Sequence, residues 1–74
     1  MDMMRKNIRY LRKKNNLTIQ KCANSIGVSR SYLSQFESGG SEMSFKNILK
    51  LRELFNISLD DLIFKDLELE EKRK

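Results

Sequence analysis

The sequence contains no histidine, no tryptophan and no proline, and its one cysteine is Cys22. Without histidine, the commonest general base and the commonest neutral metal ligand are both missing. A single cysteine can neither close a disulfide within the chain nor build a thiolate metal cage. These absences exclude a disulfide scaffold, a zinc finger and a Ser–His or Cys–His nucleophile. We therefore expect neither enzymatic activity nor a cofactor.

Long apolar runs are also missing, since no segment approaches the roughly 18 apolar residues that span a bilayer. The basic N-terminal residues are not followed by the apolar core of a signal peptide. A lone cysteine is typical of a reducing compartment. The sequence thus predicts a cytoplasmic protein without membrane contact. Its 74 residues allow one domain, which we place at residues 1–64, before a charged tail at 65–74.

Positive charge gathers in the N-terminal half of a chain whose net charge is +5. Residues 1–14 carry six cations against one acid, whereas residues 42–74 carry seven cations against eight acids. This asymmetry is expected of a protein that binds phosphate backbones, although a solvated basic helix would give the same pattern.

Helical periodicity dominates, and no segment before the tail alternates apolar and polar residues as a strand would. Residues suited to cap helix N-termini are Thr18, Ser29, Ser44 and Ser58. Residues suited to end helices are Asn15, Asn16, Gly27 and Asn56. The pattern predicts an all-α domain of five helices, at residues 3–15, 19–26, 30–37, 45–55 and from 59. The tail either prolongs the last helix or frays.

Apolar residues at helical spacing predict the core, which also takes in Cys22. We expect Tyr10 and Phe45 in the core or at its edge. The main core positions are Met4, Ile8, Leu11, Ala23, Ile26, Leu33, Phe36, Ile48, Leu51, Phe55, Leu59, Leu62 and Ile63.

Residues 18–37 are the most informative segment. Ala23 is small enough for two steeply crossing helices to meet there, and Gly27 accepts the positive φ of a sharp turn. Val28 fills the corner, and Leu33 and Phe36 anchor the second helix to the core. This spacing predicts a helix-turn-helix whose second helix faces outward.

Over residues 4–64 the sequence resembles the lambda-repressor/Cro family (the Xre-type regulators). The likeness rests on Ile8-Arg9-x-Leu11-Arg12, Leu17-Thr18, Ala23, Gly27 to Glu37, Gly39 and Ile57 to Leu62. It implies that the third helix enters the DNA major groove and that Arg12 and Glu37 form an ion pair between the first and third helices. The sequence departs from the family where Ile19 precedes Gln20, and where the loop after Gly39 lacks the usual basic residue and proline.

The start of the third helix supplies the candidates for reading bases. Arg30 can pair with guanine, Gln35 with adenine, and Ser31 and Ser34 face the same side. Arg30 could instead clamp a phosphate, Gln35 could brace Arg30, and the two serines could be ordinary surface residues. Candidates for contacts with the DNA backbone are Thr18, Gln20, Ser29, Tyr32, Ser38, Lys46 and Asn47.

The cations of the first helix, Arg5, Lys6, Arg9 and Lys13, are expected to face solvent at the edge of the DNA path. Of these, Arg9 and Lys13 are further candidates for contacts with the DNA backbone.

One recognition helix contacts too little DNA for useful specificity, so we expect a homodimer on a palindromic operator with half-sites about 34–36 Å apart. The predicted dimer surface consists of Leu59, Ile63, Phe64 and Leu67, unless these residues cover only their own core. We interpret the chain as a bacterial or phage-type DNA-binding transcriptional regulator, acting as a repressor. The alternative is a protein-interaction module, such as an antitoxin that binds a partner protein.

Overall fold

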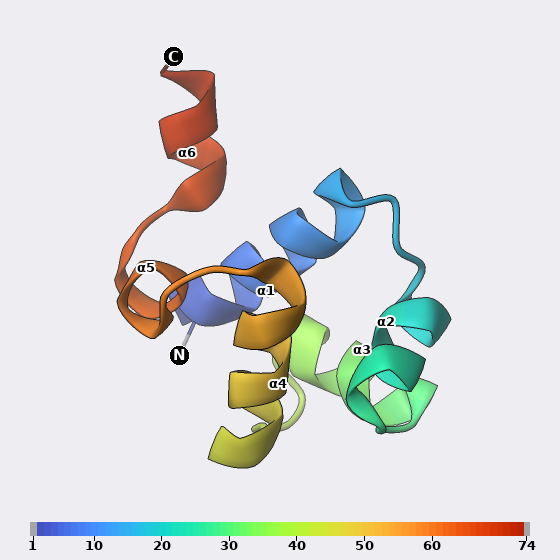
Figure 1. Ribbon diagram of the computed structural model, residues 1–74. Helices are drawn as coiled ribbons and strands as arrows, with labels where there is room; N and C mark the ends of the chain where they lie inside the picture. Colours follow the sequence, from blue (N-terminus) through green and yellow to red (C-terminus); the bar gives the residue numbers. More distant parts are fainter. Residues whose placement is uncertain (1, 74) are drawn as a thin grey trace.

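The computed structural model describes residues 2–73, which form six short helices joined by brief turns (Figure 1). The helices are α1 (Asp2–Lys14), α2 (Ile19–Ile26), α3 (Arg30–Ser38), α4 (Phe45–Phe55), α5 (Leu59–Phe64) and α6 (Leu67–Lys72). The prediction of an all-α domain is confirmed. The predicted number of five helices is wrong for the described residues, because the tail folds into a helix of its own.

Capping side chains set the helix bounds. Thr18, Ser29, Ser44 and Ser58 each accept a hydrogen bond from the backbone N–H three residues further on. At the other ends, Gly27 and Asn56 have φ of 74° and 51°, in the left-handed region that stops a helix. As a result α2 and α4 have their predicted bounds, while α3 runs one residue further, to Ser38.

The tail neither prolongs α5 nor frays within the described residues. Lys65 is extended, with φ −85° and ψ 145°, so α5 ends at Phe64. Asp66 then caps a new helix by accepting a hydrogen bond of 3.1 Å from the N–H of Leu69. Lys74 lies outside the described residues.

The core lies where α1, α2, α3, α4 and α5 meet, and it contains nearly all the predicted residues. Leu11, Phe55, Leu59 and Ile63 pack against it half-buried. Its buried apolar members are Met4, Ile8, Cys22, Ala23, Ile26, Leu33, Phe36, Met43, Ile48, Leu51 and Leu62. The core position of Cys22 is confirmed, and burial raises the pKa of its thiol.

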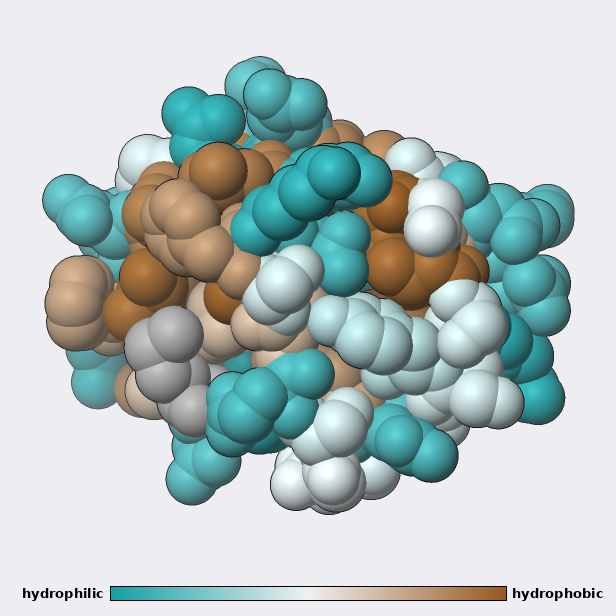
Figure 2. All heavy atoms as spheres, turned by 90° about the horizontal axis from the view of Figure 1, so that it is seen from below, coloured by the Kyte–Doolittle hydropathy of each residue, from teal (hydrophilic) through white to brown (hydrophobic). Residues whose placement is uncertain are grey.

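The expected burial of Phe45 is wrong. Met43, which precedes α4, is buried in the core, whereas Phe45, the first residue of that helix, is 59% exposed. Figure 2, which views the molecule from below, shows apolar atoms reaching the surface on the side where α5 and the start of α4 lie. None of the helices formed by residues 2–73 could span a lipid bilayer.

Candidate nucleic-acid interface

The turn between α2 and α3 is fixed by backbone hydrogen bonds. Gly27 donates to the carbonyl of Asn24 at 3.3 Å, and Val28 donates to the carbonyl of Ala23 at 3.0 Å. Ala23 itself is fully buried, so the two helices approach closely. The turn therefore gives α3 one defined orientation, which Figure 1 shows at the edge of the molecule beside α2.

One face of α3 is anchored and the opposite face is open. Leu33 and Phe36 are fully buried in the core. The four residues predicted to read bases are all exposed, and none of their side chains forms a hydrogen bond or ion pair within residues 2–73. They are Arg30, Ser31, Ser34 and Gln35. The structure thus brings the whole predicted set onto one accessible surface.

Thr18 and Ser29 begin the two helices of the turn, and both are exposed. Thr18 Oγ1 accepts from the N–H of Lys21 at 3.1 Å, and Ser29 Oγ accepts from the N–H of Tyr32 at 3.0 Å. Each hydroxyl keeps its own proton for donation to another acceptor. Gln20, also exposed, donates from Nε2 to Asn24 Oδ1 at 2.9 Å.

Tyr32 connects α3 to the start of α4. Its phenol oxygen accepts hydrogen bonds from the N–H of Ser44 at 3.2 Å and from Asn47 Nδ2 at 3.3 Å. These hydrogen bonds, that from the Ser44 backbone above all, lower the pKa of the half-buried Tyr32. Tyr32 and Asn47 therefore brace each other, whereas Lys46, the neighbour of Asn47 on α4, is exposed.

Ser38 closes the recognition helix at its other end. It is exposed and its hydroxyl donates to the carbonyl of Gln35 at 3.1 Å. A hollow of about 180 Å³ runs from Ser38 and Ser34 to Arg9 of α1. Arg9 therefore adjoins the open side of α3, and Lys13 is exposed one helical turn further along α1.

Arg12 and Glu37 are brought together as the family resemblance implies. Arg12 Nε lies 2.8 Å from Glu37 Oε2 and Nη2 lies 3.1 Å from Oε1, so the pair is bidentate. The two side chains are only 9% and 6% exposed. A third guanidinium nitrogen donates to the carbonyl of Leu17 at 2.8 Å. The pair ties α1 to the last turn of α3 and to the turn before α2.

Two buried polar residues of α1 were missed by sequence reasoning. Arg5, expected to face solvent, is 8% exposed and reaches the loop after α3. Asn7 is fully buried and donates to the carbonyls of Leu62 at 2.7 Å and Lys65 at 2.6 Å. Arg5 and Arg12 are seven residues apart on the buried side of α1, a spacing that could have indicated Arg5.

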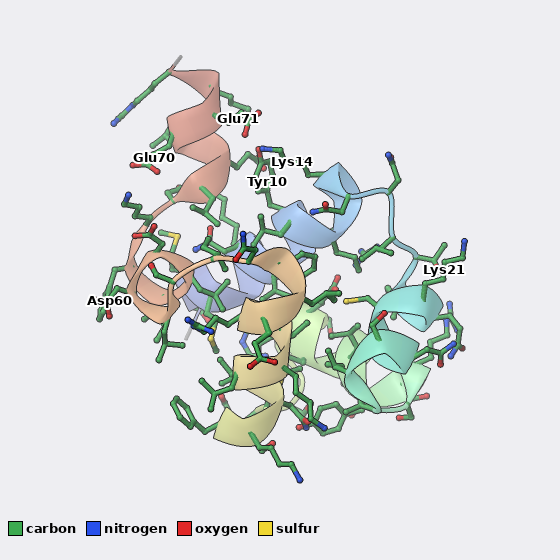
Figure 3. The ribbon with its side chains drawn as sticks, viewed as in Figure 1. Tyr10, Lys14, Lys21, Asp60, Glu70 and Glu71 are labelled. Carbon is green, nitrogen blue, oxygen red and sulfur yellow. The ribbon has the colours of Figure 1, made fainter. Side chains whose placement is uncertain are left out.

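The helix α6 packs along α1 through charged and polar side chains, as Figure 3 shows for Tyr10, Lys14 and Glu71. The Glu71 carboxylate accepts from the Tyr10 hydroxyl and from Lys14 Nζ, both at 2.6 Å. Lys6 Nζ lies 2.7 Å from Asp66 Oδ2. Lys6 and Lys14 of α1 are thus paired with acids of the other helix. Lys6 pairs with Asp66, the N-cap of α6, and Lys14 pairs with Glu71.

The residues predicted to form a dimer surface do not share one environment. Leu59 and Ile63 are half-buried against the core of their own chain, and Leu67 is half-buried beside α1. Phe64, in contrast, is 76% exposed. Phe64 is therefore the one member of this set that projects freely.

Residues 8–62 match the helix-turn-helix family. The chain belongs to this family. The predicted resemblance to lambda-repressor-like, Xre-type proteins is confirmed. α2 and α3 are the two helices of its helix-turn-helix, and α1, α4 and α5 form the support that holds them.

Three curated relatives illustrate the likeness. The antitoxin PezA of Streptococcus pneumoniae is 39% identical over 64 residues, which cover 86% of this chain and 40% of PezA. The HTH-type transcriptional regulator YqaE of Bacillus subtilis is 30% identical over 61 residues, covering 82% of this chain and 53% of YqaE. An HTH-type transcriptional regulator of Archaeoglobus fulgidus is 37% identical over 71 residues, covering 95% of this chain and 100% of that protein.

The chain therefore spans about half or less of the length of PezA and YqaE, and the full length of the Archaeoglobus protein. No solved structure matches it significantly.

Proposed function

We propose that the chain binds double-stranded DNA sequence-specifically, with α3 in the major groove. The observation that carries this proposal is the open face of α3, where Arg30, Ser31, Ser34 and Gln35 are exposed together. A guanidinium can donate two hydrogen bonds to guanine O6 and N7, and an amide can pair with adenine. Arg30 and Gln35 would therefore read base edges, and the two serines would adapt to them.

Contacts with the phosphates would position α3 in the groove. Thr18, Ser29 and Ser38 supply hydroxyl groups around α2 and α3, and Gln20 supplies an amide. The start of α4 adds Lys46, Asn47 and backbone N–H groups that carry the positive end of a helix dipole. In this arrangement Tyr32 acts mainly as a brace, and Arg9 with Lys13 extends the cationic edge.

We further propose that the chain acts in the cytoplasm as a homodimer and represses transcription at a palindromic operator. Two copies would double the number of bases read, with half-sites about one helical turn, 34–36 Å, apart. The exposed side chain of Phe64 supports α5 as the contact between copies.

The test is the salt dependence of binding to duplex DNA. A protein that neutralises several phosphates loses affinity steeply as salt rises, with a slope of about −0.9 per phosphate contact. We expect nanomolar binding to a selected duplex at low salt, and weaker binding to a scrambled duplex. The absence of duplex binding at low salt would contradict the proposal.

A second candidate function is that of an interaction module which binds a partner protein. The match to PezA, a protein named as an antitoxin, favours this candidate. It predicts that a protein partner binds the chain when the face of α3 carries no DNA. Failure to bind DNA together with retention of a protein partner would favour this second function.

A further inference from the structure

We propose that Arg5 is a positioning residue for DNA binding, because it fixes the loop between α3 and α4 and the start of α4. This loop comprises residues 39–44 and connects the recognition helix to the N-terminus of α4. The proposal rests on the proposed function and deepens it. It gives a role in binding to a side chain that lies inside the molecule rather than at the interface.

The Arg5 guanidinium joins three points that are far apart in the sequence from Arg5 itself. Its Nη1 donates to the carbonyl of Phe36, in the last turn of α3, and to the carbonyl of Ser41 at 2.7 Å. Its Nη2 donates to Glu42 Oε1 at 2.9 Å. The charged group also stacks on the Phe36 ring, 4.7 Å from its centre. One side chain of α1 thus holds both the end of α3 and the loop.

The loop needs such an anchor because its own sequence is permissive. It begins Gly39-Gly40-Ser41 and contains no proline. Gly39 takes φ of 91°, and glycine loses more conformational freedom on ordering than any other residue. Arg5 holds the loop at residues 41–42, and the Tyr32 hydroxyl holds its last residue, Ser44.

The position of the loop bears directly on the binding of phosphates. Ser44 is the N-cap of α4, whose first N–H groups, together with Lys46, belong to the proposed phosphate-binding set. A shift of the loop would move these groups relative to Arg30 and the rest of the α3 face. Arg5 therefore sets the distance between two parts of the same interface without touching DNA.

Glu42 allows the positioning role to be separated from simple electrostatics. Its side chain is 79% exposed, whereas that of Arg5 is 10% exposed. Removing a negative charge near DNA strengthens binding if only charge matters. Removing a partner of Arg5 weakens binding if the loop must be held. The two effects have opposite signs.

The experiment compares Glu42→Ala with Glu53→Ala, which removes an exposed carboxylate on α4 that has no ion pair within residues 2–73. The measurement is the affinity for a selected duplex at several salt concentrations, below the melting temperature of every variant. We expect Glu42→Ala to bind roughly two- to fivefold more weakly than wild type. Glu53→Ala should bind as tightly as wild type or slightly more tightly. Glu42→Gln keeps an oxygen acceptor for Arg5 and should restore binding.

Arg5→Lys is the second test, because it keeps the charge but cannot bridge three acceptors with a planar fork. We expect roughly tenfold weaker binding. The salt slope should also become smaller, by about one for each phosphate that the displaced loop no longer neutralises. If Arg5→Lys fails to fold, the exposed Glu42 variants alone decide the question.

The outcomes distinguish the two proposals. If Glu42→Ala and Glu53→Ala bind DNA equally tightly and the wild-type protein binds DNA, the role of Arg5 is overturned but the proposed function is not. Wild-type protein that binds no duplex at all would overturn both the proposed function and this inference.

Discussion

Arg30 is the side chain on which base discrimination depends most in the proposed interface. It is exposed at the first position of α3, where a guanidinium can form two parallel hydrogen bonds to one base. We expect Arg30→Ala to reduce the preference for the selected duplex by about 1–3 kcal/mol at one base pair. The melting temperature should stay unchanged.

The control for Arg30→Ala is Arg73→Ala, which removes the same charge at the end of α6. It should weaken binding to all duplexes equally and only slightly. Arg30→Lys separates base reading from phosphate binding, since lysine still attracts a phosphate but cannot form the bidentate pair with a base. An unchanged ranking of duplexes for Arg30→Ala would show that Arg30 clamps a phosphate rather than reading a base.

Glu37 is expected to matter for folding rather than for contact with DNA. Its loss would leave the Arg12 guanidinium, 9% exposed, without its carboxylate partner. Breaking a buried pair from one side costs about 3–5 kcal/mol. Urea denaturation of Glu37→Ala should show this decrease in the free energy of unfolding, whereas Glu53→Ala should not. A decrease below about 1 kcal/mol, typical of exposed pairs, would show that the pair contributes little.

Residue types explain why some of these positions could be predicted and others could not. Apolar stripes locate the core because apolar residues at helical spacing are buried together. Two residues do not follow this rule: Met43 is buried although it lies outside a helix, and Phe45 is exposed although it lies in one. Arg5 and Asn7 are polar, so the same reasoning assigns them to the surface. Their burial depends on acceptors in α3 and the loop after it, and in α5 and the residue that follows it. Only the folded chain brings these acceptors together.

Among the helices, α6 was the hardest to predict because it depends on tertiary contacts. It has no fully buried residue, and its charged sequence with Leu67 and Leu69 has no helical apolar stripe. Asn7 Oδ1 accepts the N–H of Leu67 at 3.1 Å, which fixes where the helix begins. The bounds of α2 and α4, in contrast, match the prediction at both ends, because the capping residues that set them lie next to the helix in the sequence.

The attachment of α6 should depend on pH. The hydrogen bond from Lys6, followed by that from the Leu69 N–H, lowers the pKa of Asp66 below its ordinary value of 3.8. A carboxylate with a lowered pKa contributes to the folded state above its ordinary pKa, and this contribution is lost as the pH falls through the lowered value. We therefore expect α6 to detach from α1 in acid, below about pH 4.

Amide hydrogen exchange can follow this detachment, since the Leu69 N–H is bonded to Asp66 and the Leu33 N–H lies in the core helix α3. Relative to Leu33, Leu69 should lose protection in acid and at high salt. Asp66→Asn should show the same loss already at neutral pH. Equal protection of both amides across this range would mean that α6 is held by packing rather than by charge.

The molecule as a whole offers one prominent apolar side chain on α5, Phe64, 76% exposed. If α5 forms the homodimer contact, each copy buries this ring, and full burial of a phenylalanine is worth roughly 1.5–3 kcal/mol. Phe64→Ser should then convert the dimer to monomers in sedimentation at concentrations where wild type is dimeric. The fold should survive, because the exposed ring adds little to its own core.

Loss of the dimer in Phe64→Ser should also lower the affinity for the operator, because one copy reads only one half-site. Deleting residues 65–74 provides the comparison, since it removes Leu67 and α6 but keeps Phe64. The deletion also removes the partners of the buried Asn7 at Lys65 and Leu67, so circular dichroism must show that the truncated chain still folds. A dimer that survives this deletion and is absent in Phe64→Ser would place the interface on α5. A dimer that survives Phe64→Ser and is absent after the deletion would place the interface on α6. The half-buried Leu67 and its neighbours, rather than α5, would then set the spacing of the two recognition helices.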